Sequence, residues 1–69
     1  MIKDKGINKT LRLKIVEHFG TQEKLSFMSG IDEAVISKIV RNVRIPTKKQ
    51  KEVFSSLLKT SERILFKNI

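Results

Sequence analysis

The chain has 69 residues, no cysteine, and 15 Lys and Arg against seven Asp and Glu, which gives a formal net charge of +8. So short a chain forms at most one domain, and without cysteine it has neither a disulfide framework nor a thiolate metal site. The excess of positive charge favours a polyanionic partner, which includes DNA, RNA and an anionic membrane surface.

Residues 1–8 are polar and basic, with only Ile2 and Ile7 to anchor them. We expect them to form a basic, flexible N-terminal arm, followed by one folded domain over residues 9–69. The first residues lack the apolar stretch of a signal peptide, and no apolar run approaches the roughly 18 residues that span a bilayer. These observations predict a cytoplasmic protein without a membrane partner.

Two short helices are predicted in the first half of the chain. The first begins at Thr10 and ends at Gly20, where a left-handed cap is easily formed. Thr21 is a typical N-cap for the second, which ends at Ser29 and Gly30. The apolar residues expected to face the core recur at helical spacing and are Leu11, Ile15, Val16, Phe19, Leu25 and Met28.

Further helices are predicted after Asp32, after Thr47 and after Ser61, three residues that favour the N-cap position. A loop over residues 41–46 separates the first two of these helices, because Pro46 disfavours helix at the residue before it. The segment after Thr60 is short enough to be helix or strand, and we favour helix. Their inner residues are Val35, Ile36, Ile39, Val40, Val53, Phe54, Leu57 and Leu58, and the last helix runs through Ile64 and Leu65. We expect the four phenylalanines to supply most of the large core volume. The predicted fold is all-α, a compact bundle of about five short helices.

The segment from Gln22 to Val40 has the spacing of a helix-turn-helix. Gly30 stands at the corner, and Leu25, Ile31 and Ile36 supply apolar contacts where the two helices meet. A two-helix hairpin inside any helical bundle could share this spacing, so the pattern alone does not establish DNA binding.

The amino-acid sequence of this segment resembles that of a known family. His18 to Leu25 (HFGTQEKL), Gly30 to Ile39 (GIDEAVISKI) and the pair Ile45-Pro46 look like the DNA-binding domain of phage repressors of the Cro and CI type, and HFGTQ is most similar to small Cro proteins. The resemblance covers roughly residues 11–58. It implies a lambda-repressor-like domain that binds double-stranded DNA in a sequence-specific way and acts as a transcriptional repressor.

In that family the third helix, here about residues 33–40, lies in the major groove. The resemblance implies base contacts by Glu33, Ala34 and Lys38. Lysine donates to guanine, alanine suits a thymine methyl group, and a glutamate either accepts from cytosine or stays solvated. Independently of the family, six basic residues and no acidic one lie between Glu33 and Glu52. The resemblance also implies a phosphate contact by Gln22 at the start of the second helix. Taken together, the residues expected to contact the DNA backbone are Gln22, Ser37, Arg41, Asn42, Arg44 and Lys48.

The sequence departs from the family in three places. Many relatives have an alanine in the second helix and an acidic residue followed by glycine after the third, where this chain has Ser26 and residues 40–42 (VRN). Phe27 and Met28 also stand where polar residues are common. We expect Phe27 to be a repacked core residue, whereas an exposed Phe27 would point to a partner surface.

Other functions find less support in the sequence. His18 has no cysteine or paired acid at ligand spacing, no serine lies in a catalytic motif, and no phosphate loop is present, so we expect no enzyme, metal, cofactor or small-molecule ligand. A membrane-active peptide would need one strongly amphipathic helix, whereas the basic residues here are spread over several short helices. The alternative that stays open is an antitoxin or adaptor that uses the same fold to bind a protein.

A homodimer on a pseudo-palindromic operator is expected, because one recognition helix reads only a few base pairs. The region after Leu57, with Ile64, Phe66 and Ile69, either forms the dimer surface or closes the core.

Overall fold

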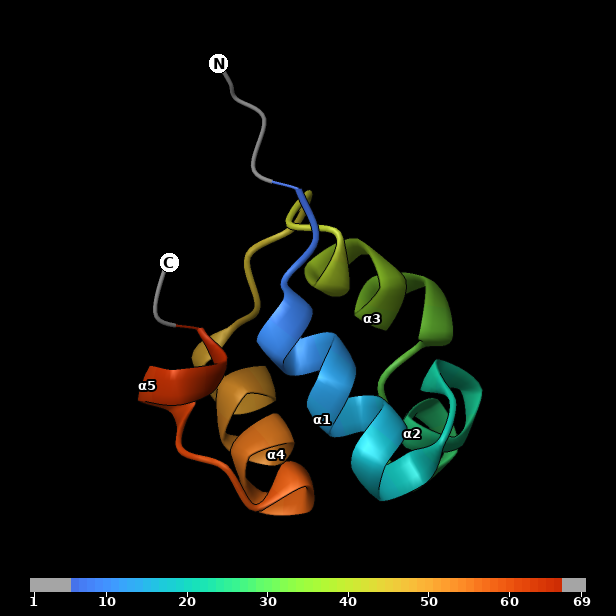
Figure 1. The fold of residues 1–69 in the computed structure, drawn as a ribbon. Coiled ribbons are helices and arrows are strands. Elements are labelled where there is room, and N and C mark those ends of the chain that lie inside the picture. Colours follow the sequence, from blue (N-terminus) through green and yellow to red (C-terminus); the bar gives the residue numbers. More distant parts are fainter. Residues whose placement is uncertain (1–5, 67–69) are drawn as a thin grey trace.

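The computed structural model describes residues 6–66, which form five short helices and no strand within that range. The helices are α1 (Lys9–Phe19), α2 (Gln22–Ser29), α3 (Glu33–Val40), α4 (Lys48–Leu58) and α5 (Glu62–Leu65). The predicted all-α bundle is confirmed, and the segment after Thr60 begins with a helix rather than a strand. Figure 1 shows α1 in the middle of the bundle, with α2 and α3 on one side and α4 and α5 on the other.

Polar side chains set where the helices begin. At each N-cap an oxygen of the side chain accepts a hydrogen bond from a backbone N–H in the first turn, which satisfies a donor that has no partner within the helix. The five caps are Asn8, Thr21, Asp32, Thr47 and Ser61. Thr47 forms a complete capping box, because its own N–H donates to Gln50 Oε1 at 2.9 Å while its hydroxyl accepts from the N–H of Gln50 at 3.1 Å. The four caps predicted from the second helix onward are confirmed.

The core lies where α1 packs against the other four helices. Its two aromatic members, Phe54 and Phe66, stand with ring centroids 5.9 Å apart in a tilted arrangement. The buried side chains of this hydrophobic cluster are Leu11, Ile15, Leu25, Ile36, Ile39, Val40, Phe54, Leu58, Leu65 and Phe66. Phe66 therefore closes the core, and its predicted alternative role in a dimer surface is wrong. Ile64 is exposed, and Ile69 lies outside the described residues.

Three apolar residues expected in the core are at the surface instead. Phe27 is 85% exposed, and Met28 and Val16 are also exposed, so the prediction that the four phenylalanines fill most of the core is wrong. Leu25 is the only fully buried side chain of α2, and Met28 lies at the rim of an open pocket that α2 shares with α4. Val16 lies beside the buried stripe of α1 rather than on it.

Asn8 belongs to the folded domain rather than to the arm in which the sequence placed it. Its backbone N–H donates to the carbonyl of Val40 at 2.7 Å, and its side-chain nitrogen donates to the carbonyl of Leu65 at 2.8 Å. Its side-chain oxygen accepts from the N–H of Leu11 at 3.1 Å. One residue thus joins the start of α1 to the ends of α3 and α5. Residues 1–5 of the predicted arm lie outside the described residues.

Candidate nucleic-acid interface

A tight turn sets α3 against α2. Gly30 adopts a left-handed conformation (φ 77°), and its N–H donates to the carbonyl of Ser26 at 2.9 Å. The hydroxyl of Ser26 crosses the turn and donates to the carbonyl of Ile31 at 2.6 Å, while the N–H of Ile31 donates to the hydroxyl of Ser29 at 3.1 Å. Ser26, the residue that departs from the family pattern, therefore has a structural role: it closes the turn between the two helices.

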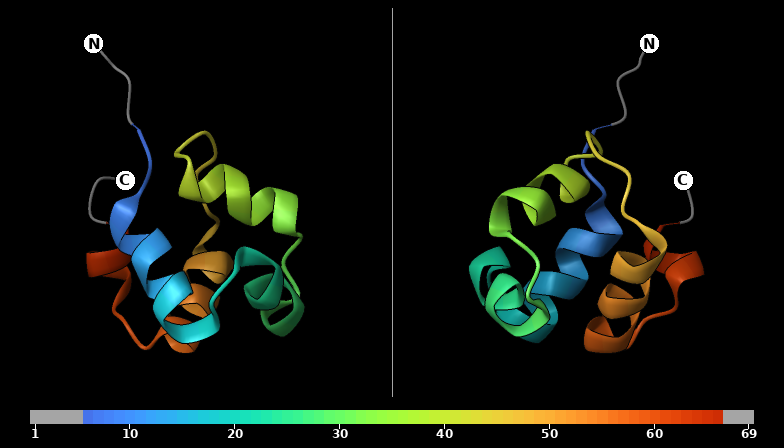
Figure 2. Two further views of the ribbon diagram at one scale, coloured as in Figure 1. Left: turned by 45° about the vertical axis from the view of Figure 1, so that its right-hand side comes forward. Right: turned by 180° about the vertical axis from the view of Figure 1, so that it is seen from behind.

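The helix α3 has one buried face and one free face. Ile36, Ile39 and Val40 are buried against the core. Because successive residues of a helix advance by about 100°, positions 33, 34, 37, 38 and 41 fall within an arc of about 140° on the other side. On this arc Glu33, Ala34, Lys38 and Arg41 are exposed and Ser37 is half-buried. Figure 2 shows α3 at the edge of the bundle in both views, with α2 beneath it.

The C-terminal end of α3 is closed by the chain itself. Asn42 has a positive φ of 63°. The hydrogen bonds that its own N–H and the N–H of Val43 donate to α3 form a Schellman motif, in which glycine usually takes the place of Asn42. Each of the last four carbonyls, those of residues 37–40, accepts a hydrogen bond. The N–H of Arg41 donates to the carbonyl of Ser37 at 3.0 Å, and the N–H of Val43 donates to that of Lys38 at 2.9 Å. The N–H of Asn42 donates to the carbonyl of Ile39 at 3.1 Å, and the N–H of Asn8 donates to that of Val40 at 2.7 Å. Asparagine is one of the few residues other than glycine that readily adopt this left-handed conformation.

The side chain of Asn42 also has a partner within the chain. Its amide nitrogen donates to the carbonyl of Gly6 at 2.9 Å, which ties the segment before α1 to the loop after α3. A contact between Asn42 and a phosphate stays a prediction.

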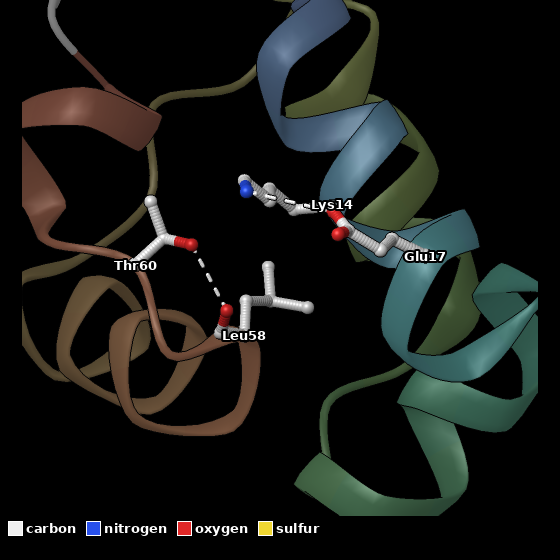
Figure 3. Close-up of polar contacts among 4 residues, drawn as sticks. All are labelled: Lys14, Glu17, Leu58 and Thr60. Atoms are coloured by element: carbon white, nitrogen blue, oxygen red, sulfur yellow. Dashed lines mark hydrogen bonds and ion pairs between the residues drawn. The ribbon is translucent and has the colours of Figure 1, made fainter.

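The basic residues of this edge carry uncompensated charge. Lys38, Arg41, Arg44 and Lys48 are all exposed. Within residues 6–66 the one ion pair lies elsewhere, on α1, between Lys14 and Glu17 at 3.5 Å. Figure 3 shows that pair, together with the Thr60 hydroxyl, which donates to the carbonyl of Leu58 at 2.9 Å where α4 ends. The four basic side chains therefore have no acidic partner among the described residues, and their charge is available to a polyanion.

Gln22, which is also predicted to contact the DNA backbone, lies at the start of α2 and is half-buried. It lines a shallow pocket together with Glu33, so the first turns of α2 and α3 adjoin the same depression. Arg12 of α1 lines that pocket too. The sequence analysis did not select Arg12, because its position in the middle of α1 gives no sign that it reaches the first turns of two other helices.

No family model matches the chain, and comparisons with curated proteins and with solved structures found no match either. The resemblance to Cro and CI repressors therefore stays an interpretation of the sequence. Among the residues that the structure describes, none of the helices combines the length and apolar character that crossing a bilayer requires.

Proposed function

We propose that this protein binds double-stranded DNA in a sequence-specific way and acts as a Cro-like transcriptional repressor. The observation that carries the proposal is the free face of α3. It is seated on the core by Ile36 and Ile39 and presents Glu33, Ala34 and Lys38 to solvent. An α-helix with its side chains is about 10–12 Å across, and the major groove of B-DNA is about 12 Å wide, so a helix with a free face such as α3 can enter it.

The charges beside this face support a duplex as the partner. Arg41, Arg44 and Lys48 stand along the loop and the start of α4, where they would meet phosphates next to the groove. Gln22 would meet a phosphate from the start of α2. Such contacts hold a protein in register without reading sequence, so the reading is assigned to Lys38, Ala34 and Glu33.

The proposal includes a homodimer in a bacterial or phage-infected cytoplasm. Two copies would place their α3 helices about 34 Å apart, one turn of DNA, so that a pseudo-palindromic operator is read twice. Ile64 stays a candidate for the dimer surface, because it is exposed on α5.

Selection of bound sites from random duplex DNA tests the proposal. We expect enrichment of a site with two half-sites centred about 10 base pairs apart, bound at least about 1,000-fold more tightly than random duplex at physiological salt. Lys38→Ala should weaken the selected site by about 1–3 kcal/mol and relax preference at one base position. Lys49→Ala is the matched control, because it removes the same charge from a groove beside Met28 and Leu57. Absence of any enriched sequence, or equal binding of duplex and single strands, would reject the proposal.

A second candidate function is the binding of a protein partner, as in an antitoxin or adaptor. Phe27 and Met28 favour it, because both are exposed at neighbouring positions of α2, and an exposed apolar patch is typical of a protein interaction site. Phe27→Ser should abolish capture of such a partner from nuclease-treated extract and leave DNA binding unchanged. If only DNA binding changes, this second function is excluded.

A further inference from the structure

The loop between α3 and α4 turns its apolar side chains outward. Val43 is 66% exposed and Ile45 is 67% exposed, whereas Asn42 is half-buried and Pro46 is buried. This arrangement is the reverse of the usual one, in which branched apolar residues are the most often buried. Ile7, also exposed, lies next to Gly6, whose carbonyl is bonded to this loop.

Hydrogen bonds hold the loop in this conformation at both ends. The N–H of Val43 donates to the carbonyl of Lys38 at 2.9 Å, and the side chain of Asn42 donates to the carbonyl of Gly6 at 2.9 Å. At the other end the capping box of Thr47 and Gln50 begins α4. Because the backbone is fixed on both sides, the two apolar side chains cannot turn into the core without breaking these bonds.

The surroundings of the two side chains are strongly basic. Arg41, Arg44 and Lys48 flank them, all exposed, and no acidic residue occurs between Glu33 and Glu52. A surface that combines positive charge with outward apolar groups matches a polyanion that itself has apolar parts. A nucleic-acid duplex has such parts, since sugar carbons and thymine methyl groups line its grooves between the phosphates.

We propose that Val43 and Ile45 form a non-ionic contact surface for duplex DNA, packing against sugar carbons and the groove wall beside the site occupied by α3. This inference rests on the proposed DNA-binding function and extends it to a contact that carries no charge. Arginine side chains next to the two residues bind phosphates, while the apolar pair removes its own surface from water on the same duplex.

Two other occupants fit the observations less well. A second copy of the chain would bring Arg41, Arg44 and Lys48 of both copies together, and the like charges would repel. A bilayer surface is usually bound by an amphipathic helix with Trp, Phe or Leu at the interface, whereas this surface is a short loop with valine and isoleucine.

The test uses Val43→Ser, Ile45→Ser and the double variant, with Leu13→Ser as the control, because Leu13 is equally exposed at 67% but lies on α1. Binding of the selected duplex is titrated at several salt concentrations. Each single variant should bind about fivefold more weakly and the double variant about 20-fold, as expected when a branched side chain is partly buried on binding. The slope of log affinity against log salt should stay unchanged, since no ionic contact is lost. Leu13→Ser should stay within about twofold of the original chain.

The outcomes separate this inference from the proposed function. If the original chain binds a preferred duplex and the double variant binds it equally well, the inference is overturned and the proposed function stands. A chain without preference for duplex DNA would overturn both. The double variant is also tested on anionic phospholipid vesicles and by sedimentation equilibrium. Loss of vesicle binding or of self-association, with DNA binding unchanged, would likewise overturn the inference.

Discussion

Replacement of Asn8 measures how much the end of α5 stabilises the start of α1. Its side chain makes two bonds: Oδ1 accepts from the N–H of Leu11, and Nδ2 donates to the carbonyl of Leu65. Loss of an N-cap costs about 1 kcal/mol, and loss of a partly buried hydrogen bond costs about another 1 kcal/mol. Asn8→Ala should therefore lower the free energy of unfolding by about 2 kcal/mol. That is a large share of the roughly 3–10 kcal/mol expected for a chain of this size.

Two variants separate the contributions of the two bonds. Asn8→Ser keeps an oxygen for the cap but cannot reach the carbonyl of Leu65, so it should cost about 1 kcal/mol. Thr21→Ala removes a cap alone, the bond from the N–H of Lys24 at 3.1 Å, and should also cost about 1 kcal/mol. Asn8→Ser therefore loses only the bond to Leu65, and Thr21→Ala loses only a cap, whereas Asn8→Ala loses one bond of each kind.

Urea unfolding followed by circular dichroism supplies the three free energies, provided the denaturant slope stays constant among the variants. The melting temperature of Asn8→Ala should fall by about 10 °C or more. If Asn8→Ala proves no more destabilising than Thr21→Ala, then the bond between α1 and the end of α5 contributes nothing, and the reasoning is refuted.

Three further predictions concern the turn and the basic loop. Arg44→Ala should weaken binding to all duplex sequences alike and make the salt dependence shallower by about one unit; an unchanged slope in a salt titration would contradict a phosphate contact. Gly30→Ala should lower the free energy of unfolding by about 1–2 kcal/mol through backbone strain alone, because no heavy atom lies within 4 Å of the added Cβ; urea unfolding would disprove this if the loss were negligible. Ser26→Ala should cost about 1 kcal/mol by removing the bond across the turn, and an unaltered melting temperature would contradict that role.

The helix boundaries could be predicted from the sequence because capping is local. Thr21, Asp32 and Thr47 bond to N–H groups two or three residues away, so their effect is contained in a few neighbouring letters. The stripe of α3 was equally predictable, since an eight-residue helix with Ile36, Ile39 and Val40 on one side leaves the other side free.

The remaining features depend on contacts between distant segments. Asn8 forms hydrogen bonds with Val40 and Leu65, which lie 32 and 57 positions further along the chain. No pattern of neighbouring residues indicates such distant partners. Phe27 was assigned to the core on its hydrophobicity, but tertiary packing decides which side of α2 is buried, and it buries Leu25 and leaves Phe27 exposed. For Phe66 the sequence left two roles open, a dimer surface or the core. The structure places its ring against Phe54 in the core.

The bond between Asn8 and Leu65 has a topological consequence. Because it brings the two ends of the described domain together, a short linker from Phe66 to Asn8 could join them, and new ends could be opened between Arg44 and Ile45. Such a circular permutant would keep every helix intact while cutting the loop beside α3. Folding and the proposed recognition of DNA would then be measured separately, in a chain that keeps residues 8–66 and loses the bond from Asn42 to Gly6.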